Sequence, residues 1–496
     1  MKERHPPATR TAALVVASML TMVTACAAFG PPRTPPSMAV PAHYSIAPAI
    51  PQLPTDRGRP QQLLMGAAPV LEWWRAFGNA QLDALVSEAL EKNQSLAAAK
   101  ANLRAAHEQV RDQVGSNLYP QLDAGFAPSR QRGLGIPVLA QQTYLYNVFA
   151  AEVQGSWTLD LFGAAALADR ALLGQVRVQA YELEAARRAV AFNVVLAAIN
   201  SASLQAQLDA MGQYADAAEQ RARQLRERFE LGSASHLDML TAEEEAAEAQ
   251  RVLPPLHRQL LAVQHAEAVL LGRTPDAAPP PLSLDELHPP ERLPVSVPSE
   301  LLHQRPDILA AEATVRASAD AAGAASAALY PSLTLSGAYG RGGFNWATFA
   351  SPAGAIWGIG GSLTQPLFHG GALHARQRQY QATYEAAVAQ YRQTVLTAFQ
   401  SVADTLVSLE DDAKELQETR RSAEALKEVQ QELEGRYASG SEQLYAVLGA
   451  RSQYQNAYVA YVAARVARLT DSAALLDAMG NPPSPIEATR CTTDGR

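Results

Sequence analysis

The chain has 496 residues, 48% of them hydrophobic and 18% charged, which is enough for a large core and for two or three domains. Its formal net charge of -8 argues against nucleic acid as a partner, because nucleic-acid binding usually needs a basic face. The two cysteines, Cys26 and Cys491, form neither a metal-binding spacing nor a disulfide framework. The sequence has no glycine-rich phosphate loop, no G-x-S-x-G and no HExxH motif, so we expect neither an enzyme nor a bound cofactor.

The N-terminus carries a signal for export. Basic residues at positions 2, 4 and 10 precede an apolar run over residues 12–24, which is too short to span a bilayer and is typical of a signal peptide, here residues 1–25. The run ends at Val23-Thr24-Ala25-Cys26, which resembles a lipoprotein signal. That resemblance, with alanines at positions 27 and 28, implies acylation of Cys26 and an outer-membrane anchor. The alternative is an ordinary signal peptide cut after an alanine, with Cys26 incidental.

Two proline-rich segments divide the rest of the chain. Residues 26–70 are rich in proline up to Pro60, which predicts an extended tether without helix or sheet. The resemblance to a lipoprotein signal implies that this tether is lipidated at Cys26. We therefore expect the folded part to begin near Leu71. A linker over residues 275–298 separates two halves, residues 71–274 and 299–480, and residues 481–496 form a C-terminal tail.

The two halves repeat each other at an offset near 210 residues. Leu118-Tyr119-Pro120 returns as Leu329-Tyr330-Pro331, residues 156–162 return loosely as 362–368, and residues 228–232 return as 436–440. Three matches in the same order indicate an internal two-fold repeat.

Each half predicts a helix, two strands, a long helix and a further helix. We expect the first helix over about residues 79–117 and the first long helix over about 164–231, which is roughly 100 Å at 1.5 Å per residue. Small and apolar residues recur in both long helices in the four-three steps of a coiled coil, namely Val190, Val194, Ala197, Ser201, Leu204, Leu208 and Met211, and Val388, Tyr391, Val395, Ala398 and Val402.

The strands are expected in hairpins at about residues 118–162 and 329–368. Apolar and polar residues alternate along them, most clearly from Val153 to Leu161. Runs of about ten residues with one apolar and one polar face are typical of membrane β-barrels, and the edge of a soluble sandwich is the alternative. The export signal and the shortage of further strands favour the barrel.

A membrane sheet has to close, because every backbone group in lipid must be paired. Four strands per chain are too few, since about eight make the smallest practical barrel. Two copies would give about eight strands with a filled interior, whereas three would give about twelve and a water-filled lumen. We therefore expect a homotrimeric α+β membrane protein, in which a transmembrane β-barrel continues into a long coiled-coil α-barrel.

Several stretches together resemble one family. Residues 72–77 (EWWRAF) match its opening segment, and residues 270–275 match a further landmark. Residues 301–308 (LLHQRPDI) are similar to its LL-x-RRPDI signature, with Gln304 in place of an arginine. Over about residues 26–480, the chain resembles the outer-membrane factors of tripartite efflux pumps, of the NodT/OprM lipoprotein type related to TolC.

This resemblance implies a passive exit duct in the outer membrane, in contact with its lipid and extending into the periplasm, for small toxic molecules such as antibiotics. The implied partners are two more copies of the chain, a periplasmic adaptor protein and an inner-membrane transporter. Residues 71–78 and 275–298 are expected in a belt around the helices. Type I protein secretion uses the same kind of tube, and a non-conducting envelope tether is a third reading, which the alternating strands disfavour.

The turns at Gly232 and Gly440 are expected to be the periplasmic tips, because glycine after a helix adopts the left-handed conformation that other residues resist. In the family, these tips contact the adaptor. The resemblance assigns that contact to Arg228, Gly232, Ser233, Leu237, Asp238, Leu240, Arg436, Gly440, Ser441, Leu444 and Leu448. Helix capping and core packing are the alternative roles.

The family also places a constricting residue and an acidic residue on the helix after the second tip. The matching positions are Tyr445 and Gly449, and Gly449 departs from the usual aspartate. We expect Tyr445 to narrow the tube, with Glu442 and Arg451 as the nearby charges.

Extracellular loops are expected over residues 128–147 and 342–352. Five aromatic residues mark either a girdle or packing within these loops, namely Tyr144, Tyr146, Phe344, Trp346 and Phe349. The run Glu243-Glu244-Glu245 is expected to be a solvated helix face, and the scattered histidines predict no metal site.

Overall fold

The computed structural model describes residues 29–44, 51–55, 60–134 and 143–480. They fall into two compact units: unit 1 contains residues up to 37, 103–178 and 311–391, and unit 2 contains the others. The predicted signal peptide, Cys26 and the tail with Cys491 lie outside the described residues.

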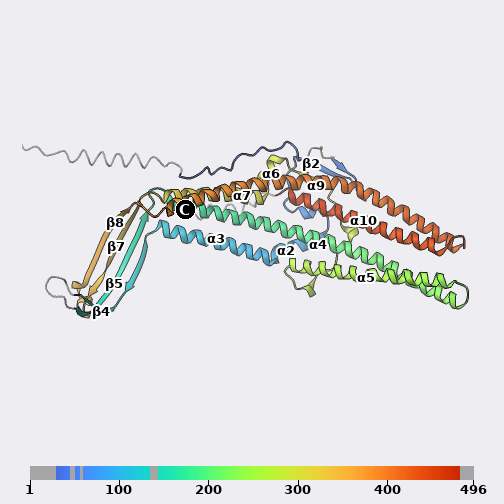
Figure 1. Cartoon of the computed structure of the whole chain (residues 1–496), viewed down its shortest axis with the longest axis horizontal. Coiled ribbons are helices and arrows are strands. Elements are labelled where there is room, and N and C mark those ends of the chain that lie inside the picture. Colours follow the sequence, from blue (N-terminus) through green and yellow to red (C-terminus); the bar gives the residue numbers. More distant parts are fainter. Residues whose placement is uncertain (1–28, 45–50, 56–59, 135–142, 481–496) are drawn as a thin grey trace, which may run out of the picture. The chain divides into compact units, whose positions relative to one another are not determined.

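Unit 1 contains an antiparallel sheet in the order β3-β5-β7-β8 (Figure 1). Strands β3 and β4 pair with successive parts of β5, residues 151–156 and 143–148, so together they occupy one strand position and the sheet has four. Within the described part of the chain, β3 and β8 pair with a strand on one side only. The strands are β3 (Gln121–Phe126), β4 (Ser129–Leu134), β5 (Thr143–Leu159), β7 (Ser332–Gly343) and β8 (Ala355–Thr364).

The register gives this sheet one apolar and one polar face. Val153 lies opposite Ala124 and Tyr339, and Tyr339 lies opposite Trp357. Because side chains alternate along a strand, the intervening polar residues share the other face. The apolar face carries Leu122, Val153, Trp157, Leu335, Tyr339, Trp357 and Ile359, and the polar face carries Asp123, Glu152, Gln154, Ser156, Thr158, Thr334 and Ser336. The predicted alternation therefore holds where β3, β5, β7 and β8 pair with one another, and it does not extend to β4.

The two expected loops are only partly loops. Residues 128–147 include β4 and the start of β5, because Ser129–Leu134 pairs with β5 although its own composition shows no alternation. Residues 342–352 include a short helix, α8 (Trp346–Ala350). Its aromatic rings pack on the sheet, with the Trp346 and Phe149 ring centroids 5.8 Å apart. The side chain of Tyr144 lies outside the described residues.

The long helices agree with the expectation. Helices α4 (Ala164–Glu230) and α9 (Ala372–Ala438) have 67 residues each, and the helices that follow, α5 (His236–Leu270) and α10 (Leu444–Ala478), have 35 each. In the second half, α6 (Pro298–Gln304) and α7 (Pro306–Ala327) precede β7.

The single helix expected over residues 79–117 is wrong, because Asn93 divides it into α2 (Ala80–Lys92) and α3 (Gln94–Leu118). The Asn93 Oδ1 atom accepts hydrogen bonds from the backbone N–H groups of Ser95 and Leu96, at 2.9 and 3.2 Å. Its Nδ2 atom donates to the carbonyl of Leu270 at 2.8 Å. Asn93 therefore caps α3 and ties it to the end of α5.

The expectation that residues 26–70 contain no sheet is also wrong. In unit 2, β1 (Gln52–Leu53) pairs with β2 (Gln61–Met65), which runs parallel to β6 (Arg292–Val295). The buried Gln61 side chain donates to the carbonyl of Pro290 and to Ser472 Oγ, at 2.9 and 3.1 Å. These long-range bonds fold a segment that its composition marks as extended. Three 3-10 helices lie within the predicted belt, η1 (Trp73–Phe77), η2 (Pro275–Ala277) and η3 (Leu284–Glu286), and a fourth, η4 (Pro352–Gly354), precedes β8.

A group of charges around the buried Arg468 joins α9 to α10. Arg468 is 1% exposed and donates from Nη1 to the Leu409 carbonyl. Asp412 and Asp471 lie beside it and share a hydrogen bond. Burial, together with the charge of Asp471, raises the pKa of Asp412 to about 6, and burial also raises the pKa of Asp471. Burial lowers the pKa of Arg468 to about 10.

This arrangement predicts that the protein loses stability as the pH rises. A carboxyl group whose pKa is raised by folding contributes its full stability below about pH 4, and loses it as the pH rises through about 6. Replacing Asp412 with asparagine should therefore stabilise the protein at pH 7.5 by about 1 kcal/mol, allowing for partial exposure to water, and by much less at pH 4. Thermal unfolding of the detergent-solubilised protein, followed by circular dichroism, measures this. Asp411→Asn, at the exposed neighbouring carboxylate, is the control, and an equal gain in both variants contradicts the prediction.

Candidate functional site

The candidate site is the pair of helix turns in unit 2, between α4 and α5 and between α9 and α10. At the first turn, Gly232 has φ +73°, and its N–H donates to the Phe229 carbonyl at 2.9 Å. The Ser233 N–H donates to the Arg228 carbonyl at 2.7 Å, and the Ser233 hydroxyl donates to the same oxygen at 2.9 Å. This is a Schellman ending, which needs a left-handed residue after the helix.

The second turn has the same hydrogen bonds. Gly440 has φ +76°, and its N–H donates to the Tyr437 carbonyl at 3.0 Å. The N–H and hydroxyl of Ser441 donate to the Arg436 carbonyl at 2.9 and 3.0 Å. At both turns the arginine therefore supplies its carbonyl to the turn. The Arg436 guanidinium pairs one turn back, with Glu432.

The helices that leave the two turns begin differently. The Ser235 hydroxyl accepts a hydrogen bond from the Asp238 N–H at 3.0 Å, so it caps α5, and Asp238 lies in the first turn, where a negative charge is favourable. Gln443 precedes α10 without a side-chain cap. The Glu442 carboxylate instead accepts from the Gln443 N–H at 3.1 Å.

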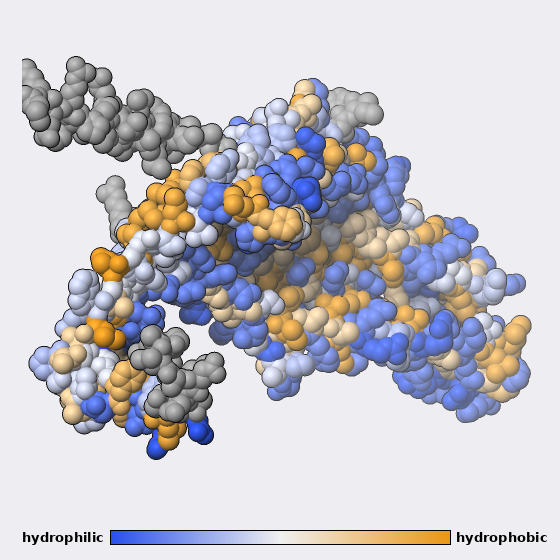
Figure 2. Space-filling model, turned by 60° about the vertical axis from the view of Figure 1, so that its left-hand side comes forward, coloured by the Kyte–Doolittle hydropathy of each residue, from blue (hydrophilic) through white to orange (hydrophobic). Residues whose placement is uncertain are grey.

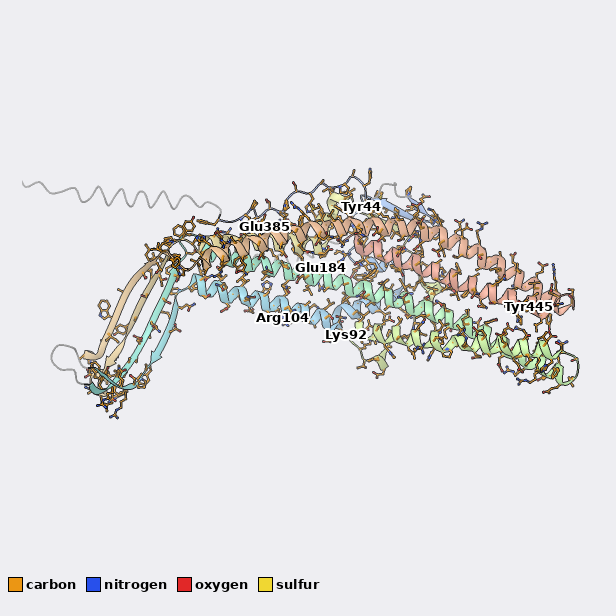
Figure 3. All side chains as sticks on the ribbon, in the orientation of Figure 1. Tyr44, Lys92, Arg104, Glu184, Glu385 and Tyr445 are labelled. Atoms are coloured by element: carbon orange, nitrogen blue, oxygen red, sulfur yellow. The ribbon has the colours of Figure 1, made fainter. Side chains whose placement is uncertain are left out.

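Large apolar side chains are exposed at these turns. Leu231, Leu237 and Tyr445 are 83%, 74% and 80% exposed, and Leu240 is also exposed. Figure 2 shows a hydrophobic patch at the turn end of the helices, and Figure 3 shows Tyr445 at the start of α10. Leu231 was not among the predicted contact residues. Its position directly before Gly232 could have indicated that its side chain is exposed at the turn.

Two predicted contact residues lie inside instead. Leu444 is 4% exposed and belongs to a core cluster with Ala218 and Ala246, and Leu448 packs against the same cluster. This cluster joins the start of α10 to the α4–α5 hairpin. The side chain of Leu444 is therefore not available to a partner, because it holds the two turns together.

The expectation of a fully solvated acidic face at residues 243–245 is wrong for Glu245. Its buried carboxylate accepts hydrogen bonds from Arg221 Nη1 at 2.6 Å and from the Tyr214 hydroxyl at 3.0 Å. Burial, followed by the neighbouring Glu245 charge, raises the pKa of Tyr214. Glu243 pairs with Arg226 at the surface. The acidic run thus fastens α5 to α4 below the first turn.

The predicted gate residues do not form one group. The Arg451 Nε atom donates to Glu434 on α9 at 2.6 Å. Glu442 is bound at the start of α10, and Tyr445 is exposed. Arg451 therefore ties α10 to α9 within the chain.

The residue that departs from the family signature has a role in the belt. Gln304 Oε1 accepts a hydrogen bond from the Ser296 hydroxyl at 2.7 Å. Arg305 pairs with Asp307 through Nε and Nη2, at 3.1 and 2.8 Å, and donates from Nη1 to the Ala478 carbonyl at 3.2 Å. This signature therefore fastens the end of α10 to α7. Within the described residues, no group of three or more histidine, cysteine or acidic side chains is placed to hold a metal ion.

Comparison with known proteins agrees with this geometry. The family model described as outer membrane efflux protein matches residues 85–273 and 297–481. The pyoverdine export outer membrane protein OpmQ of Pseudomonas aeruginosa is 30% identical over 423 residues, which cover 84% of this chain and 88% of that protein. Outer membrane protein OprJ of the same species is 30% identical over 424 residues, which cover 82% of this chain and 86% of that protein.

The fold is also found among solved structures. The crystal structure of the Campylobacter jejuni CmeC outer membrane channel matches with a TM-score of 0.80 at 21% identity, covering 92% of this chain and 97% of that one. This likeness establishes the fold. Because the family model covers most of the sequence in two consecutive matches, this chain belongs to the outer membrane efflux protein family.

Proposed function

We propose that this chain is one subunit of the outer-membrane exit duct of a tripartite efflux pump, a passive conduit that an adaptor protein opens at the helix turns. The observation that carries the proposal is the sheet of unit 1, which has an apolar face, a polar face and two edges. Such a sheet fits a barrel wall between lipid and water.

The edges of this sheet support a homotrimer. Strands β3 and β8 each leave one row of N–H and C=O groups without a strand partner in the described residues, and in hydrocarbon each unpaired group costs several kcal/mol. Three copies would join β8 of one chain to the β3–β4 edge of the next. The result is a barrel of about twelve strands, with the face that contains Gln154 and Thr158 lining the water-filled lumen.

The equal helices support a chain built from two duplicated halves, residues 71–274 and 299–480. The pairs α4/α9 and α5/α10 match in length, and their turns close with the same bonds. Three such chains would place twelve helices side by side in an α-barrel, namely α4, α5, α9 and α10 of each chain. The four-three spacing in α4 and α9 suits that packing.

The N-terminal pattern supports lipidation of Cys26 after removal of residues 1–25. Several acyl chains anchor a protein stably where one chain does not, because each buried methylene contributes about 0.8 kcal/mol. A sheet in the same membrane as this anchor would hold the duct from two points.

The exposed part of the turns is the proposed adaptor surface. Its residues are Arg228, Leu231, Gly232, Ser233, Leu237, Asp238, Leu240, Arg436, Gly440 and Ser441, with Leu448 at its margin. An apolar patch beside two rigid turns suits a helical hairpin of a partner. The inner-membrane transporter would supply energy and select the exported molecule. For the relative OpmQ, the exported molecule named is pyoverdine.

The lipid-facing assignment can be tested with a pair of neighbouring substitutions. Val153→Arg places a charge on the apolar face near the middle of β5, and should cost about 2–4 kcal/mol of insertion free energy. Gln154→Arg places the same charge on the polar face and should insert normally. The amount of folded protein in outer-membrane fractions measures both. Equal insertion of the two variants would contradict the assignment.

The turns can be tested with proline. Gly232→Pro or Gly440→Pro should lower drug resistance to near the level of the deletion strain, because proline fixes φ near −65° and cannot adopt the observed positive φ. The trimers should remain in the membrane. Asparagine, which tolerates the left-handed region, is the control at each position and should retain most resistance. Normal resistance in the proline variants would count against a role for the turns.

The gate can be tested by conductance. Tyr445→Ala should raise the resting conductance of the duct in planar bilayers, because it removes the exposed ring that we propose narrows the lumen. Leu237→Ala, also at an exposed turn position, should leave conductance unchanged. An unchanged current through the Tyr445 variant would remove this residue from the gate.

A further inference from the structure

The first described residues of unit 1, Phe29 to Pro36, lie along α7 and the start of α9, and we call them the strap (Figure 1). The Phe29 ring packs on Tyr330, with ring centroids 5.0 Å apart. The Tyr384 hydroxyl donates a hydrogen bond to the Pro32 carbonyl at 3.1 Å. The strap thus has defined contacts with α9 and with the segment that joins α7 to β7, unlike a free tether.

Two glycines let the strap approach α7 closely. A Cβ atom on Gly323 would lie 2.3 Å from the Phe29 carbonyl oxygen, and a Cβ on Gly30 would lie 2.8 Å from the Gly323 Cα. Gly30 also has φ +111°. Because both obstructing atoms belong to the backbone, any larger residue at either position has to push the strap away from the helix.

An ion pair lies next to this close contact. The Arg33 Nε atom is 3.0 Å from Asp320 Oδ1, and the Asp320 side chain is 2% exposed. Asp320 is one helical turn before Gly323 on α7, so both contacts face the strap. Removing the arginine would leave a buried carboxylate without this counter-charge, which is far more costly than losing a surface pair.

The strap begins at the base of the sheet. Tyr330, which holds Phe29, comes two residues before β7, and its ring stacks on Phe162, three residues after β5, with centroids 5.2 Å apart. Cys26 precedes Phe29 by three residues, and three residues span at most about 10 Å. The length of this link therefore limits how far an acyl anchor attached at Cys26 can be from a docked Phe29.

We propose that the strap sets the height of the acyl anchor relative to the sheet, by docking on Gly323 and Asp320 of α7. This inference rests on the proposed lipidation of Cys26. The docked strap makes the lipid chains and the strands enter one membrane surface together, so that insertion of the strands is guided by an anchor already in place. Phe29, Gly30, Arg33, Asp320 and Gly323 act here as positioning residues.

The docking can be measured with a spin label at Thr34→Cys, in a Cys491→Ser background where acylation blocks the sulfur of Cys26. In membranes, the label should be immobilised in the parent protein and mobile in Gly323→Ala and Arg33→Glu. For Arg33→Glu, we expect the docking equilibrium to fall roughly a hundredfold. Gly115→Ala, at a helical glycine with open space around it, is the matched control and should leave the label immobile.

The role in anchoring is measured in the same variants, as the amount of folded, membrane-inserted protein per acylated chain. We expect a several-fold loss in Gly323→Ala and Arg33→Glu. Because alanine favours helix more than glycine, a folding defect of α7 does not explain a loss in Gly323→Ala. Adding Asp320→Asn to Arg33→Glu removes the charge repulsion and should restore both readouts in part.

Each outcome decides a different claim. An immobile label in both undocking variants overturns the docking. A mobile label with normal insertion per acylated chain overturns the positioning role. Mass spectrometry of the mature N-terminal peptide tests lipidation separately: an unacylated Cys26 overturns that part of the proposed function and the height of the anchor with it, while the label still reports whether the strap docks.

Discussion

Unpaired backbone groups at the edges of the β3-β5-β7-β8 sheet are the constraint on which the proposed assembly depends. Within the described residues, the sheet has four strand positions and pairs no further strand at β3 or β8. Water can satisfy such edges but hydrocarbon cannot. The apolar face of the same sheet suits lipid, and in lipid the two edges would need further strands, which the proposed homotrimer supplies. The register of the strands also collects polar side chains on the other face, which would line the lumen of the proposed barrel.

Local periodicity allowed much of this fold to be predicted from the sequence. Alternation in β5 and β7, and the four-three spacing in α4 and α9, are properties of single segments, and they place these elements well. What could not be predicted depends on partners distant in sequence. Strand β4 exists because β5 pairs with it. Asn93 divides a helix because its side chain binds the Leu270 carbonyl and caps the first turn of α3. Strands β1 and β2 form because β2 pairs with β6.

The candidate site divides in the same way. The glycine turns were predictable, because a backbone position with positive φ strongly favours glycine. Gly232 and Gly440 both adopt a positive φ. Burial was not predictable. Leu237 and Leu444 are both leucines just after a turn, yet one is exposed and the other fills the cluster around Ala218 and Ala246. Likewise, Glu243 and Glu245 both pair with arginines of α4, yet Glu243 stays partly exposed beside Arg226, whereas Glu245 is buried against Arg221 and Tyr214.

The unequal caps after the two turns have a mechanical consequence. Ser235 caps the first turn of α5 with a side-chain hydrogen bond, whereas Gln443, the residue before α10, provides no such bond. A cap of this kind contributes about 1 kcal/mol. The two hairpins have equal length, but the start of α10 is therefore less stable than the start of α5. Under a load applied at the turns, fraying should start at Leu444, and the withdrawal of that leucine from its cluster would loosen one hairpin from the other.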